Sequence, residues 1–177
     1  KRTAKLAVIY SDLDREFLIE ELKRKRIEPL GPVGKLTEED ILTSTHIVAQ
    51  MGLEPIMQAL EAGAEIILAG RAYDPTVFAA LPVLQGYDLA LALHMGKILE
   101  CAAIAANPGS GSDCLLGTLT KDSFILEALN PERECTRLSV AAHTLYEKSN
   151  PYSLPGPGGA LDLHETTFEQ LPGGRVK

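Results

Sequence analysis

The stretch AEIILAGRAYDPTVF, residues 64–78, constrains the fold more than any other part of the chain. Its first half is a short apolar run of the kind that forms buried strands. Gly70 then breaks the run, and Asp74 followed by Pro75 supplies residues with which helices commonly begin. A strand that leads directly into a helix indicates an α/β architecture, in which such strands usually pair in parallel.

The segments before this unit show the same alternation of strand and helix. LAVIY (6–10) predicts a second buried strand, and REFLIEELKRKRI (15–27) predicts a helix. Thr37 and Asp40 have the spacing of a capping box, and the apolar spacing over 53–62 predicts a further helix. We therefore expect an α/β fold with a mostly parallel sheet flanked by helices.

The second half of the chain carries less regular signals. YDLALALHMGKILECAAIAAN (87–107) is mostly typical of one helix, whereas PGSGSD (108–113) and LPGPGG (154–159) predict irregular breaks. The last segment (160–177) alternates in places and contains a Pro-Gly-Gly turn, which indicates a hairpin. We therefore expect an irregular C-terminal portion that ends in a hairpin.

Length and composition narrow the class of protein. The 177 residues fit a single α/β domain, with a body over 1–107 and the irregular portion over 108–177, and we expect the chain to be a fragment of a longer protein. A net charge of -7 and the absence of Trp argue against a nucleic-acid partner. No apolar run approaches the roughly 20 residues that span a bilayer, so we expect no membrane partner. The three separated cysteines favour a reducing cytoplasm over a disulfide framework.

The loop after the strand at 65–69 is the first candidate site, because ligands of parallel sheets bind beyond the carboxyl ends of strands. Gly70 lets a ligand approach the backbone closely. Arg71, beside free N–H groups at a helix start, offers a cradle for a carboxylate or phosphate. Each side chain also has a structural alternative: Asp74 as an N-cap, and Arg71 as the ion-pair partner of Asp74 or Glu65.

The segment HMGKILEC (94–101) is the second candidate. His94, Lys97 and Cys101 share one face of the expected helix, and a thiol needs a neighbouring base or cation to become a nucleophile. Two helical turns, roughly 10.5 Å, separate the histidine from the cysteine along the axis. Cys101 as a small buried apolar residue is therefore the stronger alternative.

Two histidine–carboxylate pairs have spacings compatible with metal ligands. His143 and Glu147 lie four residues apart on an expected helix, and Asp162 and His164 share a strand face. Neither pair has a third ligand nearby in the sequence. We therefore expect surface polar pairs and no metal site, with metal-assisted chemistry through His94, His143 or His164 as a weaker alternative.

Several blocks of the chain, taken together, resemble the acyclic terpene utilisation family, a group long carried as a domain of unknown function. The blocks are MGLEPIMQALEAGAEIILAGRAYDPTVFAAL (51–81), GKILECAA (96–103) and TLYEKSNPYSLPGP (144–157). The resemblance runs from about residue 50 to the C-terminus and is to the family's middle and C-terminal part. The chain departs from the family pattern where Lys97 replaces a histidine and Gly156 an aspartate. The matching residues are Gly70, Arg71, Asp74, Glu100 and Cys101.

The resemblance implies a bacterial-type catabolic protein of the cytoplasm, associated with the breakdown of branched acids or their coenzyme A (CoA) thioesters, and an N-terminal part of the family domain outside this chain. We expect an enzyme of the lyase or hydratase type, acting on a small acidic or CoA-linked substrate with an unidentified cofactor. Gly70 and Arg71 are the expected substrate-binding residues, and Asp74, Glu100 and Cys101 the expected catalytic ones. The alternative is a non-catalytic subunit or interaction module that forms a homo-oligomer or needs a partner chain.

Overall fold

The computed structural model describes residues 3–177 as a mixed α/β protein. No helix of the described chain is long and apolar enough to cross a membrane. The elements in chain order are β1 (Leu6–Ile9), α1 (Arg15–Lys23), α2 (Glu38–Thr43), α3 (Glu54–Glu61), β2 (Ile66–Ala69), α4 (Pro75–Leu84), α5 (Leu89–Leu99), the 3-10 turn η1 (Ala102–Ile104), β3 (Leu115–Leu119), β4 (Phe124–Ala128), α6 (Arg137–Thr144), β5 (Ser153–Gly156), β6 (Gly159–Asp162), β7 (Gln170–Leu171) and β8 (Arg175–Val176).

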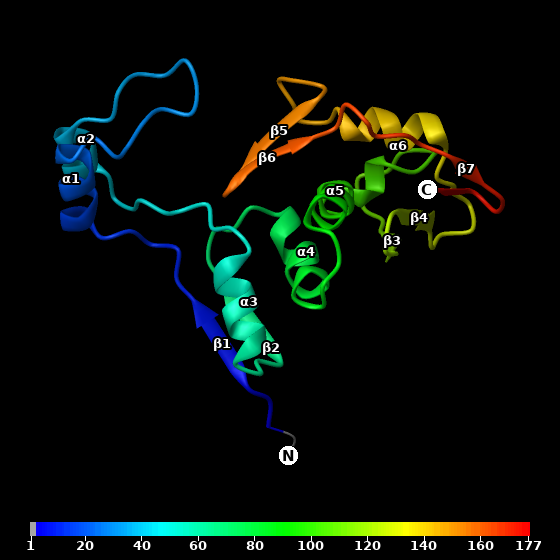
Figure 1. Ribbon diagram of the computed structural model, residues 1–177, viewed down its shortest axis with the longest axis horizontal. Coiled ribbons are helices and arrows are strands. Elements are labelled where there is room, and N and C mark those ends of the chain that lie inside the picture. The colour runs from blue at the N-terminus through cyan, green and yellow to red at the C-terminus, as the bar shows by residue number, and fades with distance from the viewer. Residues whose placement is uncertain (1–2) are drawn as a thin grey trace.

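The elements form an open arrangement. Figure 1 shows α1 and α2 at one end of the view, α4 and α5 in the centre, and α6 with β3, β4 and β7 at the other end. The two strands predicted from the N-terminal half, β1 and β2, pair in parallel beside α3. The predicted capping box is also present: Thr37 and Asp40 each bind the other's backbone N–H at the start of α2.

The prediction of a mostly parallel sheet is wrong. Only β1 and β2 are parallel among the described strands. Four strands form an antiparallel sheet in the order β3-β4-β8-β7, and β5 and β6 form an antiparallel hairpin. Local turn chemistry accounts for the β3–β4, β5–β6 and β7–β8 pairs, because short polar or Gly-containing connections return the chain directly to the neighbouring strand. One such turn joins Thr120 N–H to the Ser123 carbonyl at 2.8 Å. The predicted hairpin at the C-terminus is present as β7 and β8.

One face of the small parallel sheet lacks a covering layer. Helix α3 contacts both strands on one side, but Leu6, Val8, Ile66 and Leu68 are each about half exposed on the other. The strand register places Leu6 opposite Ile66 and Val8 opposite Leu68, so the four side chains form one apolar patch, here called the β1–β2 face. Parallel sheets are normally covered on both sides. The β1–β2 face is therefore unusual for a parallel pair, and the prediction that these two strands are buried is wrong.

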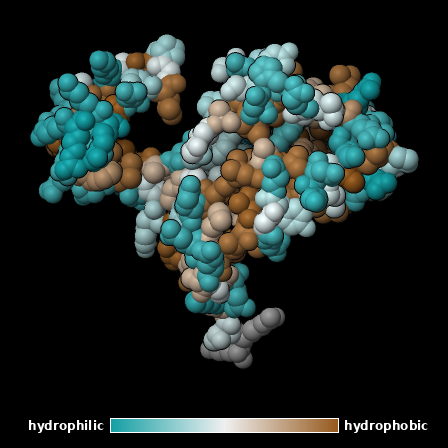
Figure 2. All heavy atoms as spheres, in the orientation of Figure 1, coloured by the Kyte–Doolittle hydropathy of each residue, from teal (hydrophilic) through white to brown (hydrophobic). Residues whose placement is uncertain are grey.

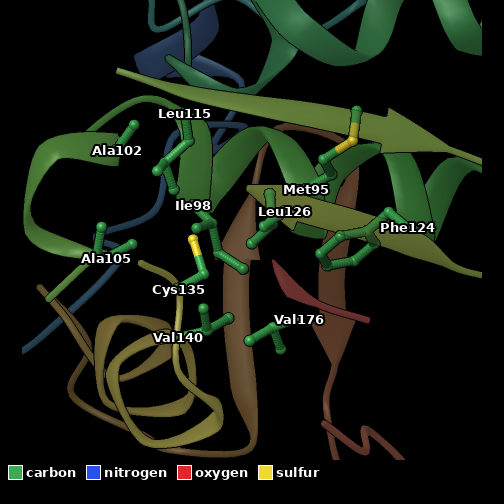
Figure 3. Close-up of a cluster of buried hydrophobic side chains, with 11 residues drawn as sticks. Met95, Ile98, Ala102, Ala105, Leu115, Phe124, Leu126, Cys135, Val140 and Val176 are labelled. Carbon is green, nitrogen blue, oxygen red and sulfur yellow. The ribbon is translucent and has the colours of Figure 1, made fainter. Parts of the chain in front are cut away.

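The main hydrophobic core lies between α5, α6 and the four-stranded sheet. Figure 3 shows its side chains converging from these elements, with Ile98 and Leu126 completely buried. Val176 of β8 is 1% exposed and pairs with Leu126, so β8 closes this core. Burying a side chain of this size stabilises a fold by about 1.5–3 kcal/mol. The core thus fixes the position of α5, which carries the residues of the site described below.

Helices α4 and α5 cross with almost no space between their backbones. A Cβ atom on Gly96 would lie 2.6 Å from the Pro75 carbonyl oxygen and 3.3 Å from the Phe78 Cβ. The close crossing places the first turn of α4 beside the last turns of α5. Residues that follow Gly70 and residues near Glu100, thirty positions apart in sequence, are therefore neighbours in space.

Candidate functional site

The loop between β2 and α4 is anchored to the end of β1. A Cβ on Gly70 would lie 2.4 Å from the Ser11 Oγ and 2.9 Å from the Ser11 backbone nitrogen. The next residue, Arg71, donates its backbone N–H to the same Oγ at 2.9 Å. Gly70 therefore lets the two strand ends touch, and this contact accounts for the glycine without a ligand.

The side chains of Arg71 and Asp74 form an ion pair, and both are about half exposed. Asp74 accepts no backbone N–H at the start of α4, so the N-cap role is not the one it takes. Glu65, the other possible partner of the arginine, accepts the backbone N–H of Lys5 instead. Arg71 thus has one anionic partner but retains a solvent-facing edge.

A second ion pair, Lys97 with Glu100, is enclosed at the end of α5. The two side chains are 7% and 8% exposed and hydrogen-bond one turn apart along the helix. Lys97 also lies 3.6 Å from a carboxylate oxygen of Glu147, which follows α6, and 6.0 Å from the ring centroid of Tyr146. The ends of α5 and α6 therefore build one shared group of charged and aromatic residues.

Burial and the ion pair act in opposite directions on the pKa values of the pair. Burial lowers the pKa of Lys97, but the hydrogen bond to Glu100 and the nearby carboxylates outweigh it, so the net shift is upward. Burial raises the pKa of Glu100, and its bond to Lys97 offsets only part of that rise. The lysine consequently keeps its proton, while the glutamate is closer to accepting one than an ordinary carboxylate.

A cavity of about 500 Å³ lies beside this pair, here called the Glu100 cavity. Glu100, Cys101, Phe78 and Tyr146 are among the residues that line it. Burial, together with the charges of Glu100 and Glu147, raises the pKa of the Cys101 thiol. The thiol is therefore held in its protonated form, which is the weaker nucleophile.

The predicted catalytic residues are brought into one electrostatic environment. The charge of Asp74 contributes to raising the pKa values of Tyr73, Glu100 and Cys101. This proximity follows from the α4–α5 crossing. Arg71 and Asp74 do not themselves line the Glu100 cavity. The chain therefore has a surface ion pair next to an enclosed one, with the cavity on the side of the enclosed pair.

Lys148 is a candidate residue that the sequence alone does not indicate. Its Nζ atom is enclosed and has no hydrogen-bond partner within residues 3–177. Burial and the nearby charge of Lys97 lower the pKa of Lys148 to about 8. No local pattern indicates this burial, because it depends on the contact between α5 and the end of α6.

The histidines do not take the roles considered from their spacing. His94 is directed to Thr144, not to Cys101, with 3.3 Å between His94 Nε2 and Thr144 Oγ1. His143 donates its Nε2 proton to the Cys101 carbonyl at 3.0 Å, and His164 Nδ1 lies 2.6 Å from Asp162 Oδ1 on the surface. Among residues 3–177 no three His, Cys, Asp or Glu side chains are grouped so as to hold a metal ion.

Comparison with known proteins identifies the family. The family profile described as acyclic terpene utilisation family protein AtuA matches residues 3–110, more than half of the chain. The chain belongs to the acyclic terpene utilisation family. No curated protein and no solved structure matches it significantly. The family match includes Arg71, Asp74, Glu100 and Cys101; it begins earlier than the resemblance in the sequence, and it leaves out the segment at 144–157.

Proposed function

We propose that this member of the acyclic terpene utilisation family is a cytoplasmic catabolic enzyme that performs acid–base chemistry on a small acidic or CoA-linked substrate, as a lyase or hydratase does. One observation carries the proposal. An enclosed carboxyl group with a raised pKa, Glu100, lies next to a lysine whose pKa is also raised, and it lines a cavity of about 500 Å³. Perturbed titratable groups beside a cavity are typical of catalytic sites.

Each residue of the site has a distinct role in this proposal. Glu100 exchanges a proton with a carbon or oxygen of the substrate, because a raised pKa suits a carboxylate to proton transfer near neutral pH. Lys97, 7% exposed and held charged, stabilises negative charge that develops on the substrate. Arg71 binds an outer acidic group at the start of α4, with Asp74 holding its guanidinium. Cys101 contacts the substrate as a neutral thiol.

The expected result of replacing Glu100 with Gln is a fall of about a hundredfold in proton-exchange activity, within the range contributed by general acid–base catalysis. The protein is incubated in D₂O with branched short-chain acyl-CoA thioesters, and mass spectrometry measures deuterium entering the acyl chain. Glu39→Gln is the matched control, because Glu39 is an exposed carboxylate on α2. Arg71→Ala, assayed in parallel, raises the thioester concentration needed for half-maximal exchange.

Two outcomes of this experiment contradict the proposal. One is exchange by Glu100→Gln at the rate of the unchanged protein, with both folded by circular dichroism. The other is the absence of exchange in the unchanged protein with every thioester and with the corresponding free acids. The second outcome leaves the alternative function, in which the chain is a non-catalytic subunit.

A specific observation favours that second candidate, a subunit that acts as a homo-oligomer. The chain exposes 11557 Å², whereas a compact monomer of its mass exposes about 8,400 Å². Counted over two copies, the difference is about 6,300 Å², enough to supply the total of about 2,000–5,000 Å² or more that obligate dimers bury. The β1–β2 face is also uncharged, so two copies can meet there without like-charge repulsion despite the net charge of -7. Figure 2 shows further apolar side chains over the middle of the molecule, where α4 and α5 lie.

Native mass spectrometry at micromolar concentration tests the second candidate. We expect an oligomer for the unchanged protein and a single chain for Leu68→Glu, because a charge in the β1–β2 face opposes its burial. Leu30→Glu is the control, since Leu30 is fully exposed in the loop between α1 and α2. A single chain in all three samples excludes self-association through this face.

A further inference from the structure

A second cavity, here called the His94 cavity, shares no lining residue with the Glu100 cavity. Its volume is about 460 Å³, within the range of about 300–1,000 Å³ typical of small-molecule sites. Phe124, Leu126, Val140 and Val176 form an apolar wall that is continuous with the main core in Figure 3. His94 of α5 also lines the cavity, although only 4% of it is exposed.

The hydrogen bonds around His94 fix the position of its proton. Thr144 donates its single hydroxyl proton to the Val140 carbonyl at 3.2 Å, so its oxygen accepts from His94 Nε2, 3.3 Å away. Burial and the charge of Lys148 lower the pKa of His94 to about 4, and the ring is therefore neutral at pH 7. A neutral ring protonated on Nε2 leaves Nδ1 as a hydrogen-bond acceptor.

The acceptor nitrogen of His94 belongs to a ring that lines the cavity. Nδ1 has no hydrogen-bond partner within the described chain. The enclosed side-chain atoms that lack a partner do not include it, so Nδ1 remains accessible to solvent. Phe124 and Phe168 hold the ring edge-on, with centroid distances of 5.2 and 6.3 Å. The cavity thus offers one oriented acceptor in an apolar wall, and a ligand supplies the missing donor.

The charges around the cavity determine which ligands with a hydrogen-bond donor can bind there. Its outer part carries several exposed carboxylates and a single cation, Lys177, which lies 3.9 Å from Glu169. Such an opening repels anions. At the inner end the nearby charge of Lys148 opposes the burial of a cationic ligand beside His94. The carboxylates are Asp88, Asp122, Asp162, Glu165 and Glu169.

We infer that the His94 cavity binds a neutral aliphatic alcohol, whose hydroxyl group donates to His94 Nδ1 and whose hydrocarbon chain lies against Phe124, Leu126 and Val176. At roughly 30 Å³ for each non-hydrogen atom, the share that a water molecule occupies in the liquid, the cavity holds on the order of fifteen such atoms. This site goes beyond the acid–base site proposed above, and it selects against the acidic substrates proposed for that site.

Three linear probes of eight carbon atoms each test the inference: 1-octanol, octanoate and octylamine. They differ mainly in the charge and the hydrogen-bond donor capacity of the head group. We expect 1-octanol to bind at least tenfold more tightly than either of the other two, as measured by ligand-observed NMR titration at pH 7. Tighter binding of octanoate or octylamine than of 1-octanol overturns the inference.

His94→Phe removes the acceptor and keeps a flat ring between Phe124 and Phe168. We expect it to weaken 1-octanol binding about tenfold, the usual effect of one lost hydrogen bond. His46→Phe is the matched control, because His46 is 82% exposed and lies outside the cavity. Unchanged affinity in a folded His94→Phe protein contradicts the assignment.

Imidazole ¹⁵N spectra of the unchanged protein supply a readout that does not depend on the variant's folding. We expect His94 to be protonated on Nε2 at pH 7, and its Nδ1 signal to shift when 1-octanol is added. A proton on Nδ1, or an Nδ1 signal unmoved by bound alcohol, rejects the proposed contact. Glu100→Gln is expected to bind 1-octanol normally, so failure at one site is distinguishable from failure at the other.

Discussion

Gly96→Val is expected to destabilise the protein by about 4 kcal/mol or more, an exceptional effect for one substitution. Any Cβ at this position meets the Pro75 carbonyl oxygen at 2.6 Å and the Pro75 Cα at 3.2 Å. Both are backbone atoms, so relief requires α4 and α5 to separate. Replacing a helical glycine normally removes a penalty of about 1 kcal/mol, but here the steric conflict outweighs that gain.

Urea denaturation followed by circular dichroism measures the effect of Gly96→Val. Gly34→Ala is the control, because an added Cβ there meets no atom within 4 Å, and surface changes of this kind stay within about 0.5 kcal/mol. If Gly96→Val unfolds at the same urea concentration as the unchanged protein, the two helices do not cross as closely as described. The proximity of Asp74 to Glu100 then loses its structural basis.

Stability is expected to fall by about 3 kcal/mol as the pH drops from about 6.5 to about 4, because of His94. The pKa of this buried ring is lowered from 6.5 to about 4 by burial and by Lys148. Between these values the unfolded chain binds a proton that the folded chain does not, so acid favours unfolding. His143, whose pKa is also lowered, acts in the same direction, whereas Glu100, whose pKa is raised, acts in the opposite one.

The contribution of His94 is isolated by comparing the unchanged protein with His94→Phe in urea titrations at several pH values. The variant has no group that titrates at this position, so its stability is expected to decline less steeply over the same range. The carboxylates with lowered pKa values, such as Asp113, lose their contribution only at lower pH. Parallel curves for the two proteins show that His94 is not held neutral in the fold.

The N-terminal elements were predictable because their signals are local. The capping box of Thr37 and Asp40, the strand LAVIY and the helix of α3 each depend on residues within a few positions. The predicted helix over 87–107 instead ends at Leu99 and continues as the short turn η1. No Gly or Pro marks that end; His143, from a distant helix, donates a hydrogen bond to the Cys101 carbonyl just beyond it.

The candidate site was predictable only in part, for the same reason. Asp74, Glu100 and Cys101 are close together because two antiparallel helices meet at Gly96, which the helical pattern of each helix does not specify. The burial of Lys148 and the acceptor role of His94 depend on contacts with residues about fifty positions away. Spacing within one element identifies residues that share a face, but the partner of that face is set by tertiary packing.

The position of Val176 in the main core has a consequence for how the chain reaches its native state. Its strand joins Leu126 across fifty residues of sequence, and contacts of such long separation slow folding. During synthesis, α5 emerges from the ribosome well before β8. Part of the apolar surface of α5 therefore stays exposed until β8 is available to cover it. A nascent chain of this protein is therefore expected to be most prone to aggregation, and most in need of chaperones, until β8 has been translated.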